Sequence, residues 1–215
     1  MSPEQASNHL LESVSTISVI PVLALNQVEN AARIAQMLVA GGLSIIEVTL
    51  RTENALTIIE AMAAVEGANV GAGTVLDEKN VYDAKSAGAN FIVSPGYTDE
   101  LGSACEKHSI PLLPGAATPS EVMKLKARGY HFLKFFPANI NGGTDALCAF
   151  SGPLPDIQFC PTGGIGEHNI LDYLALSNVP CAGGSWIVKE TDLERNDWSQ
   201  MQNRIDQLNH IVGSK

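Results

Sequence analysis

One lysine stands inside an otherwise apolar segment, where it could act as a nucleophile. The segment His131–Phe136 is rich in aromatic residues, and strand alternation puts Lys134 on the same face as Phe132 and Phe136. Burial disfavours the ammonium form, so Lys134 should carry more free amine, the nucleophile that forms a Schiff base with a carbonyl. The segment alone fits equally well a lysine that pairs with a carboxylate or extends to the rim without a chemical role.

A second segment supplies a partner for this lysine. Within Ile45–Arg51, alternation puts Glu47, Thr49 and Arg51 on one face. Glutamate is rarely buried without a partner, and a carboxylate beside an amine can move protons to and from a substrate. Arg51 can clamp a carboxylate or a phosphate. Glu47 and Lys134 are therefore candidate catalytic residues, and a purely structural Glu47–Lys134 ion pair is the alternative.

Two glycine pairs follow late apolar segments. They are Gly163-Gly164 and Gly183-Gly184, and Ser185 follows the second pair. Backbone N–H groups that glycines expose near helix N-termini suit a phosphate dianion, and the Ser185 hydroxyl is a further donor. Ordinary tight turns are the alternative, but the occurrence of both pairs favours phosphate binding.

Small residues also end the earlier segments. Gly71–Gly73 precedes Thr74, Pro95 lies within Ser94–Gly96, and Gly115 follows Pro114. Such residues leave space at the mouth of a site, and the Thr74 hydroxyl could bind a substrate carboxylate. Taken singly, each is more typical of a turn.

Short β-rich segments that recur along the chain must position these residues. Successive segments begin about 20 to 27 residues apart, the length of one strand–helix unit with short loops. The segments are Ile17–Leu23, Ser44–Thr49, Ala68–Ala72, Phe91–Val93, Pro111–Leu113, His131–Phe136, Gln158–Pro161 and Pro180–Ala182.

Helical patterns fill the intervals. Val28–Leu38 carries an apolar stripe of helical period. Helix starts are predicted at Thr52, at Thr98 and at Thr118-Pro119, which is followed by Glu121. Helix ends are predicted at the glycines Gly41-Gly42, Gly88 and Gly129.

Eight such units with strands apolar on both faces predict a single (β/α)8 barrel, the TIM barrel, over residues 1–215. The segment before Ile17 should be a helix that caps the bottom, and Trp198–Val212 the last outer helix. A doubly wound open sheet is the structural alternative, since strand count does not prove closure. In a barrel, the chemistry lies at the carboxyl ends of the strands.

The composition limits the partners. Apolar residues make up 45% and charged residues 17%, a globular balance, and the formal net charge of -10 argues against nucleic acid or an anionic membrane as the main partner. No stretch approaches the roughly 20 apolar residues that span a bilayer, and the first residues lack the pattern of a signal peptide. We therefore expect a cytoplasmic protein with a small-molecule substrate.

Neither cysteine nor histidine spacing indicates a metal site. The four cysteines have no CxxC pair, and three lie in apolar surroundings, which favours buried free thiols; they are Cys105, Cys148, Cys160 and Cys181. The five histidines lack ligand spacing. We expect no zinc enzyme, and neither a metal nor a cofactor.

Together these residues resemble the aldolases that act on 2-keto-3-deoxy-6-phosphogluconate and 4-hydroxy-2-oxoglutarate. The resemblance covers nearly the whole chain, and each of its motifs ends a predicted strand. The motifs are EVTLR (Glu47–Arg51), GAGTV (Gly71–Val75), SPG (Ser94–Gly96), KFFPA (Lys134–Ala138), PTGGI (Pro161–Ile165) and GGSW (Gly183–Trp186).

The resemblance implies a homotrimeric barrel that uses no metal, with Lys134 as the Schiff-base lysine and Glu47 as the general acid/base. It implies that the pyruvate portion is held by Arg51, Thr74 and Lys134, in a pocket shaped by Pro95 and Phe136. It implies a phosphate site made by Gly163, Gly164, Gly184 and Ser185.

One position departs from the pattern, because many relatives carry arginine where this chain has Ala24 after Pro21–Leu23. The contact that this arginine offers to an anion would then be missing.

The expected reaction is cleavage of phosphorylated 2-keto-3-deoxygluconate to pyruvate and glyceraldehyde 3-phosphate, with 4-hydroxy-2-oxoglutarate as a further substrate. The alternatives are the phosphogalactonate analogue as substrate, a phosphosugar isomerase or epimerase without covalent catalysis, and a non-catalytic metabolite-sensing barrel.

Overall fold

The computed structural model describes residues 1–213, in which strands alternate with helices. The strands are β1 (Val19–Leu23), β2 (Ile45–Thr49), β3 (Asn69–Gly73), β4 (Phe91–Val93), β5 (Leu112–Leu113), β6 (Gly115–Ala116), β7 (Phe132–Phe135), β8 (Gln158–Pro161) and β9 (Ala182–Gly184). The helices are α1 (Pro3–Val14), η1 (Val28–Asn30), α2 (Ala31–Ala40), α3 (Ala55–Ala63), α4 (Glu78–Ser86), α5 (Asp99–Lys107), α6 (Pro119–Arg128), α7 (Gly143–Ser151), α8 (Ile170–Leu174), α9 (Glu190–Glu194) and α10 (Trp198–Gly213). The predicted domain of residues 1–215 ends on Ser214 and Lys215, which lie outside the described residues.

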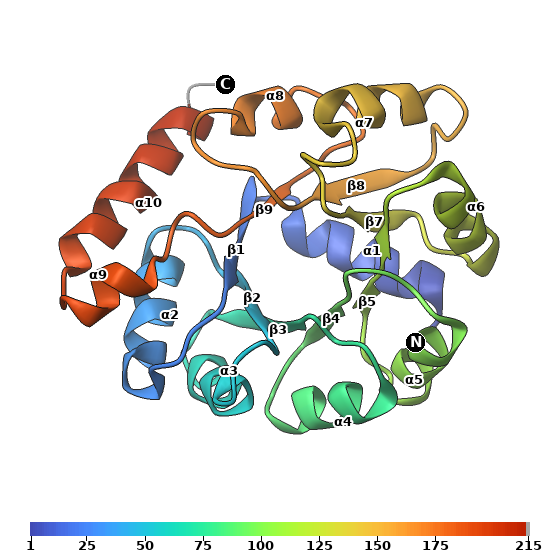
Figure 1. Ribbon diagram of the computed structural model, residues 1–215. Coiled ribbons are helices and arrows are strands. Elements are labelled where there is room, and N and C mark those ends of the chain that lie inside the picture. Colours follow the sequence, from blue (N-terminus) through green and yellow to red (C-terminus); the bar gives the residue numbers. More distant parts are fainter. Residues whose placement is uncertain (214–215) are drawn as a thin grey trace.

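All strand pairs in the described chain are parallel, and the strands form a curved sheet with most of the helices outside it and α1 across one end (Figure 1). The pairing falls into two parts, β5-β4-β3-β2-β1-β9 and β6-β7-β8, and an isolated bridge between Thr162 and Gly183 links β8 to β9. The first strand pairs with the last, and the order is otherwise sequential. That order contradicts the doubly wound alternative, in which the strand order reverses at a switch point. The predicted α/β class with a parallel sheet is confirmed, and closure into an eight-stranded barrel stays a prediction.

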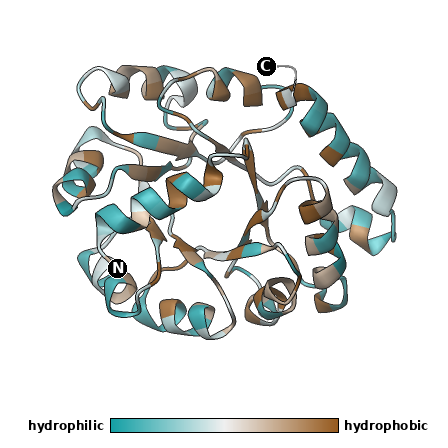
Figure 2. Cartoon of the chain, turned by 180° about the vertical axis from the view of Figure 1, so that it is seen from behind, coloured by the Kyte–Doolittle hydropathy of each residue, from teal (hydrophilic) through white to brown (hydrophobic). Residues whose placement is uncertain are grey.

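The interior of the curved sheet is layered. Its apolar floor joins Leu10 and Val14 of α1 to inward-facing strand residues, among them Phe91 and Phe132. Seen from behind in Figure 2, α1 crosses the strands at this end, as expected for the helix before Ile17. A larger apolar cluster fills the space between the outer face of the strands and the surrounding helices. Because the floor and α1 close one end of the curved sheet, the other end, where the strands have their carboxyl ends, is open.

Most of the predicted strands are present, but two differ from prediction. The segment Pro111–Leu113 contains β5, and β6 begins beyond Pro114, which has no N–H to donate to a ladder. The last strand, β9, lies two residues later than expected at Pro180–Ala182. It runs through Gly183 and Gly184, because both pair with β1, although glycine is depleted in strands.

The helix signals are mostly confirmed. Thr98 and Thr118 accept the N–H groups of Leu101 and Glu121, and Thr118 forms a capping box with Glu121. The prediction at Thr52 is wrong. Its hydroxyl donates instead to the Leu25 carbonyl oxygen at 2.7 Å, and α3 begins at Ala55.

The helix ends predicted at glycines are confirmed. Gly129 caps α6 in the left-handed conformation with φ of 100°, and Gly41 and Gly88 follow α2 and α4. The predicted helix Val28–Leu38 is the short 3₁₀ turn η1 followed by α2. None of the helices among residues 1–213 is both long and apolar enough to cross a membrane.

Candidate active site

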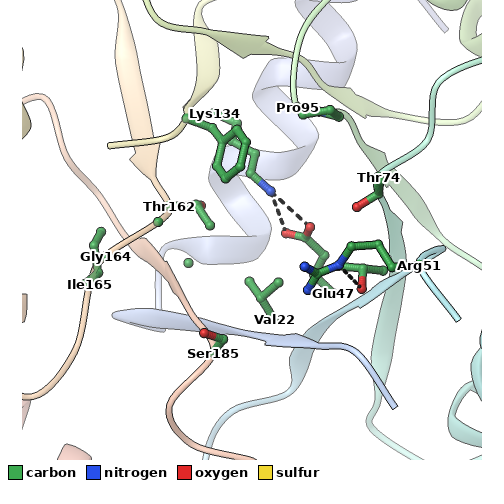
Figure 3. Close-up of a pocket in the computed structure, with 14 residues that line it drawn as sticks. Val22, Glu47, Arg51, Thr74, Pro95, Lys134, Thr162, Gly164, Ile165 and Ser185 are labelled. Carbon is green, nitrogen blue, oxygen red and sulfur yellow. Dashed lines mark hydrogen bonds and ion pairs between the residues drawn. The ribbon is translucent and has the colours of Figure 1, made fainter. Parts of the chain in front are cut away.

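Lys134 lies on β7 above the apolar floor, and its amine points into the curved sheet. The residue is 5% exposed, and its Nζ donates to Glu47 Oε1 at 3.0 Å and to Oε2 at 3.3 Å (Figure 3). The amine also lies 5.5 Å from the centre of the Phe136 ring, within the range of a cation–π contact. The predicted pairing of Lys134 with Glu47 across the interior is thus present in the structure.

Glu47 lies on β2, two residues beyond Ile45 of the apolar floor. Gly73 on the neighbouring strand leaves room for it, because a Cβ on Gly73 would overlap the Glu47 carboxylate. Within residues 1–213, Lys134 is the hydrogen-bond partner of that carboxylate. Because Lys134 is the donor to this carboxylate, the two groups are positioned to exchange protons with each other and with a ligand.

Arg51 is held next to this pair by a buried threonine. Its Nε donates to Thr49 Oγ1 at 3.1 Å, and the Thr49 hydroxyl in turn donates to the Leu23 carbonyl oxygen at 2.9 Å. Thr74, on the loop after β3, has a φ of 59°, which is unusual for a residue other than glycine. Residues in such strained backbone conformations cluster at functional sites.

A cavity of about 330 Å³ opens over the Lys134–Glu47 pair. Every predicted site residue except Gly184 lines it. The lining residues are Val22, Glu47, Thr49, Arg51, Thr74, Pro95, Lys134, Phe136, Thr162, Gly163, Gly164, Ile165, Gly183 and Ser185.

The cavity has two different ends. In Figure 3, Arg51 and Thr74 lie on one side of the ion pair. Gly164, Ile165 and Ser185 lie on the other side, on the loops that follow β8 and β9. The first end offers a guanidinium and a hydroxyl, and the second offers backbone N–H groups and a hydroxyl. An elongated ligand with an acidic group at each end fits this arrangement.

Gly184 does not line the cavity. It pairs with Pro21 inside the sheet, and a Cβ there would overlap the Trp186 ring. The absence of a side chain at Gly184 is thus explained by packing. Its neighbour Gly183 does line the cavity.

Thr162 is a cavity residue that we did not single out from the sequence. Its Oγ1 is buried and has no hydrogen-bond partner within residues 1–213. The structure reveals it, because Cys160 is the register partner of Lys134 and Thr162 lies two residues further on the same face. Ala24, where the chain departs from the family pattern, is not a lining residue.

The described residues contain no group of three or more His, Cys, Asp or Glu side chains placed to hold a metal ion. Two cationic side chains, Arg51 and Lys134, line the cavity, against the single carboxylate of Glu47. The site therefore has a local positive balance on a chain whose formal net charge is -10.

A buried lysine paired with a carboxylate, at the carboxyl ends of a parallel α/β sheet, is the arrangement that a Schiff-base lyase requires. The chain belongs to the KDPG and KHG aldolase family, whose model matches residues 10–204. KDPG is 2-keto-3-deoxy-6-phosphogluconate and KHG is 4-hydroxy-2-oxoglutarate.

Individual relatives agree with this assignment. The chain is 48% identical to a 2-dehydro-3-deoxy-phosphogluconate aldolase of Pseudoalteromonas atlantica, over 85% of this chain and 86% of that protein. It is 47% identical to the KHG/KDPG aldolase of Escherichia coli, over 88% and 90% of the two chains. A KDPG aldolase of Legionella pneumophila, solved with pyruvate captured as a covalent carbinolamine, superposes with a TM-score of 0.86. It is 43% identical and covers 91% of this chain and 96% of its own.

Proposed function

We propose that this chain cleaves KDPG to pyruvate and glyceraldehyde 3-phosphate through a Schiff base on Lys134. The observation that carries the proposal is the buried Lys134–Glu47 pair, with Nζ and Oε1 3.0 Å apart at the base of the cavity. The carbinolamine trapped in the Legionella relative is the intermediate that such a lysine would form with pyruvate.

The first half of the reaction attaches the substrate. Transfer of a proton from Nζ to the Glu47 carboxylate leaves Lys134 as a free amine, which attacks the C2 carbonyl carbon. Glu47 returns that proton to the carbinolamine oxygen, then takes a second proton from the nitrogen and delivers it to the same oxygen. Water leaves, and the iminium forms. Each proton that Lys134 gives up is one that Glu47 carries, so the pair needs no third acid.

The second half breaks the carbon skeleton. The C4 hydroxyl loses its proton to Glu47, the C3–C4 bond breaks, and its electron pair enters the iminium to give an enamine. Glyceraldehyde 3-phosphate leaves. Protonation of the enamine at C3 and hydrolysis of the new iminium release pyruvate and regenerate Lys134. The unpartnered Thr162 hydroxyl supports a hydrogen bond to a substrate hydroxyl at this centre.

The two ends of the cavity support the orientation of the substrate. Arg51 and Thr74 bind the C1 carboxylate, and Pro95 and Phe136 form the wall around the pyruvate portion. The phosphate lies against the loops that follow β8 and β9. There the N–H groups of Gly163 and Gly164 and the Ser185 hydroxyl are the proposed donors.

The proposal includes the assembly in which the site works. We propose a single domain that closes into a (β/α)8 barrel and assembles as a homotrimer in the cytoplasm. The Thr162–Gly183 bridge and the short break at Pro114 between β5 and β6 support closure. Analytical ultracentrifugation tests the trimer, and a monomer at micromolar concentration would contradict it.

KHG is the second proposed substrate, because the Escherichia coli relative carries both activities in its name. It shares the keto acid end and lacks the phosphate. The phosphogalactonate analogue differs from KDPG in stereochemistry only and is the alternative substrate. Cleavage rates for the three compounds, measured side by side, distinguish these substrates.

Borohydride trapping tests the covalent step. Reduction in the presence of pyruvate should add one pyruvate-derived mass to Lys134, located by peptide mass spectrometry. Lys134→Ala should remain unlabelled and inactive. Appreciable turnover by Lys134→Arg, without trapping in the wild type, would instead support an isomerase or epimerase. Ligand binding without any turnover would support a metabolite sensor.

A further inference from the structure

The loop after β8 offers unpaired backbone donors to the cavity. Gly163 and Gly164 have φ values of 102° and 76°, which only glycine adopts readily. Within residues 1–213, the N–H groups of Gly164 and Ile165 donate to no protein acceptor. Successive free N–H groups in such a loop form a nest for an anion. Since α8 begins only at Ile170, the loop itself presents these donors.

The direction of each N–H is fixed by the carbonyl of the same peptide unit. A trans peptide is planar, so its C=O and its N–H point in opposite directions, and a hydrogen bond that holds the C=O also aims the N–H. The Ala138 N–H holds the Thr162 carbonyl at 2.8 Å, and the Asn139 N–H holds the Gly163 carbonyl at 3.0 Å. These two bonds aim the first two peptide units of the loop.

The third peptide unit is held by a side chain. Asn169 Nδ2 donates to the Gly164 carbonyl oxygen at 3.0 Å, and Asn169 Oδ1 accepts the Gly166 N–H at 2.9 Å. Asn169 occupies the N-cap of α8, but its side chain does not cap that helix. Asparagine at this position usually accepts an N–H of its own helix. Here both of its polar groups bind the loop instead.

We propose that Asn169 is a positioning residue for the substrate phosphate: its amide holds the Gly164–Ile165 peptide so that the Ile165 N–H points at the anion. This inference rests on the proposed phosphate site. Within residues 1–213, Asn169 does not line the cavity, and its side chain hydrogen-bonds to the loop rather than to Lys134, Glu47 or Arg51. Loss of the Asn169 side chain should therefore weaken binding of the substrate phosphate and leave binding of the keto acid end unchanged.

The test compares Asn169→Ala with Leu171→Ala, an exposed position on α8 that serves as the matched control. Three quantities are measured on the intact protein. They are the KM for KDPG, the inhibition constant of inorganic phosphate, and the pyruvate concentration that gives half-maximal borohydride trapping. For Asn169→Ala we expect the first two to rise about tenfold, the order of one hydrogen bond, and the third to stay within about twofold. Leu171→Ala should match the wild type in all three.

A second variant separates the two hydrogen bonds of the amide. Asn169→Asp keeps an acceptor for the Gly166 N–H but has no donor for the Gly164 carbonyl oxygen, so it should weaken phosphate inhibition at least as much as Asn169→Ala.

Two results would overturn the role of Asn169. One is equal inhibition of wild type and both variants by phosphate, and the other is an equal loss of phosphate binding and pyruvate trapping. A wild type that fails to trap pyruvate at Lys134 would instead contradict the proposed function itself, so the two failures are distinguishable.

Discussion

Two glycines without side chains make the space in which the Lys134–Glu47 pair can form. A Cβ on Gly71 would overlap the Phe91 ring of the apolar floor, and a Cβ on Gly73 would overlap the Glu47 carboxylate one layer above. Both glycines lie on β3, on the face that points inward. The Lys134–Glu47 pair therefore depends on a residue that carries no functional group.

Gly73→Ala tests this dependence. The added methyl group should displace the Glu47 carboxylate from Lys134 and so remove its proton transfers. Because general acid–base catalysis contributes at least about a hundredfold, we expect kcat for KDPG cleavage to fall by that order. Steady-state kinetics give the measurement, and circular dichroism confirms that the variant is folded.

Gly152→Ala is the matched control, because its Cβ would meet no atom within 4 Å and its φ is -66°. That variant should keep the wild-type kcat. A Gly73→Ala enzyme with kcat within twofold of the wild type would show that Glu47 tolerates displacement and is not the proton carrier.

Part of the site could be predicted from single residues. A charge in an apolar strand is rare enough to make Lys134 and Glu47 candidate site residues. Thr162 escaped notice, because a threonine at a strand end is ordinary in sequence, and only the empty hydrogen-bonding position of its hydroxyl makes it unusual. Gly184 was predicted as part of the phosphate site, whereas in the structure it lies within β9 and makes room for Trp186. Sequence alone cannot separate these two uses of a glycine.

At the scale of elements, α6 shows most clearly how local sequence fixes a boundary. The Thr118 hydroxyl accepts the Glu121 N–H, while the Glu121 carboxylate accepts the N–H groups of Ala117 and Thr118, each at 2.9 Å. Pro119 follows the cap, where its missing N–H costs nothing. The hydrogen bond from the Ala117 backbone, followed by those from Thr118, lowers the pKa of Glu121.

Glu121→Ala should therefore destabilise the protein by about 1 kcal/mol at neutral pH, the usual value of a cap. Because the pKa of Glu121 is lower in the folded state, its contribution is present above the ordinary carboxyl pKa. The contribution is lost as the pH falls through the folded value. Urea unfolding at several pH values gives the measurement.

Glu60→Ala, on the exposed face of α3, is the control, because that side chain lies outside a helix cap. A difference between Glu121→Ala and the wild type that persists unchanged into strong acid would mean that the carboxylate does not act through these hydrogen bonds.

The elements were predictable wherever a local signal decides the structure, as at Thr98, Thr118 and Gly129. Thr52 has the same residue type, but its hydroxyl is satisfied by the Leu25 carbonyl, which is distant in sequence. The late position of β9 likewise follows from pairing with β1, a contact between the two ends of the chain. Local propensity carries no information about such partners.

At the scale of the whole molecule, the alternation of apolar strands with helices was enough to predict a parallel α/β sheet. The way in which the two parts of the sheet meet depends on a few residues, the Thr162–Gly183 bridge and the break at Pro114. Periodicity does not determine contacts of that kind. The burial of the interior can be tested by experiment, because the reactivity of a cysteine thiol depends on whether solvent reaches it.

The cysteines lie at different depths in this architecture. Cys160 and Cys181 belong to the apolar floor, Cys105 is buried on α5, and Cys148 is exposed on α7. Burial raises the pKa of the Cys105 thiol to about 12, and a hydrogen bond with Cys160 together with burial raises the pKa of Cys181. The thiolate is the reactive form, so both thiols are protected by chemistry as well as by access.

We therefore expect iodoacetamide to modify Cys148 alone in the native protein. The buried thiols should react only as fast as the molecule opens, so urea that lowers the free energy of unfolding should accelerate all three together. Mass spectrometry of timed samples gives the measurement, and Cys148→Ser should make the native protein unreactive. If Cys160 and Cys181 reacted in native buffer before Cys105, the floor under the Lys134–Glu47 pair would open independently of the surrounding helices. The site would then rest on a mobile base.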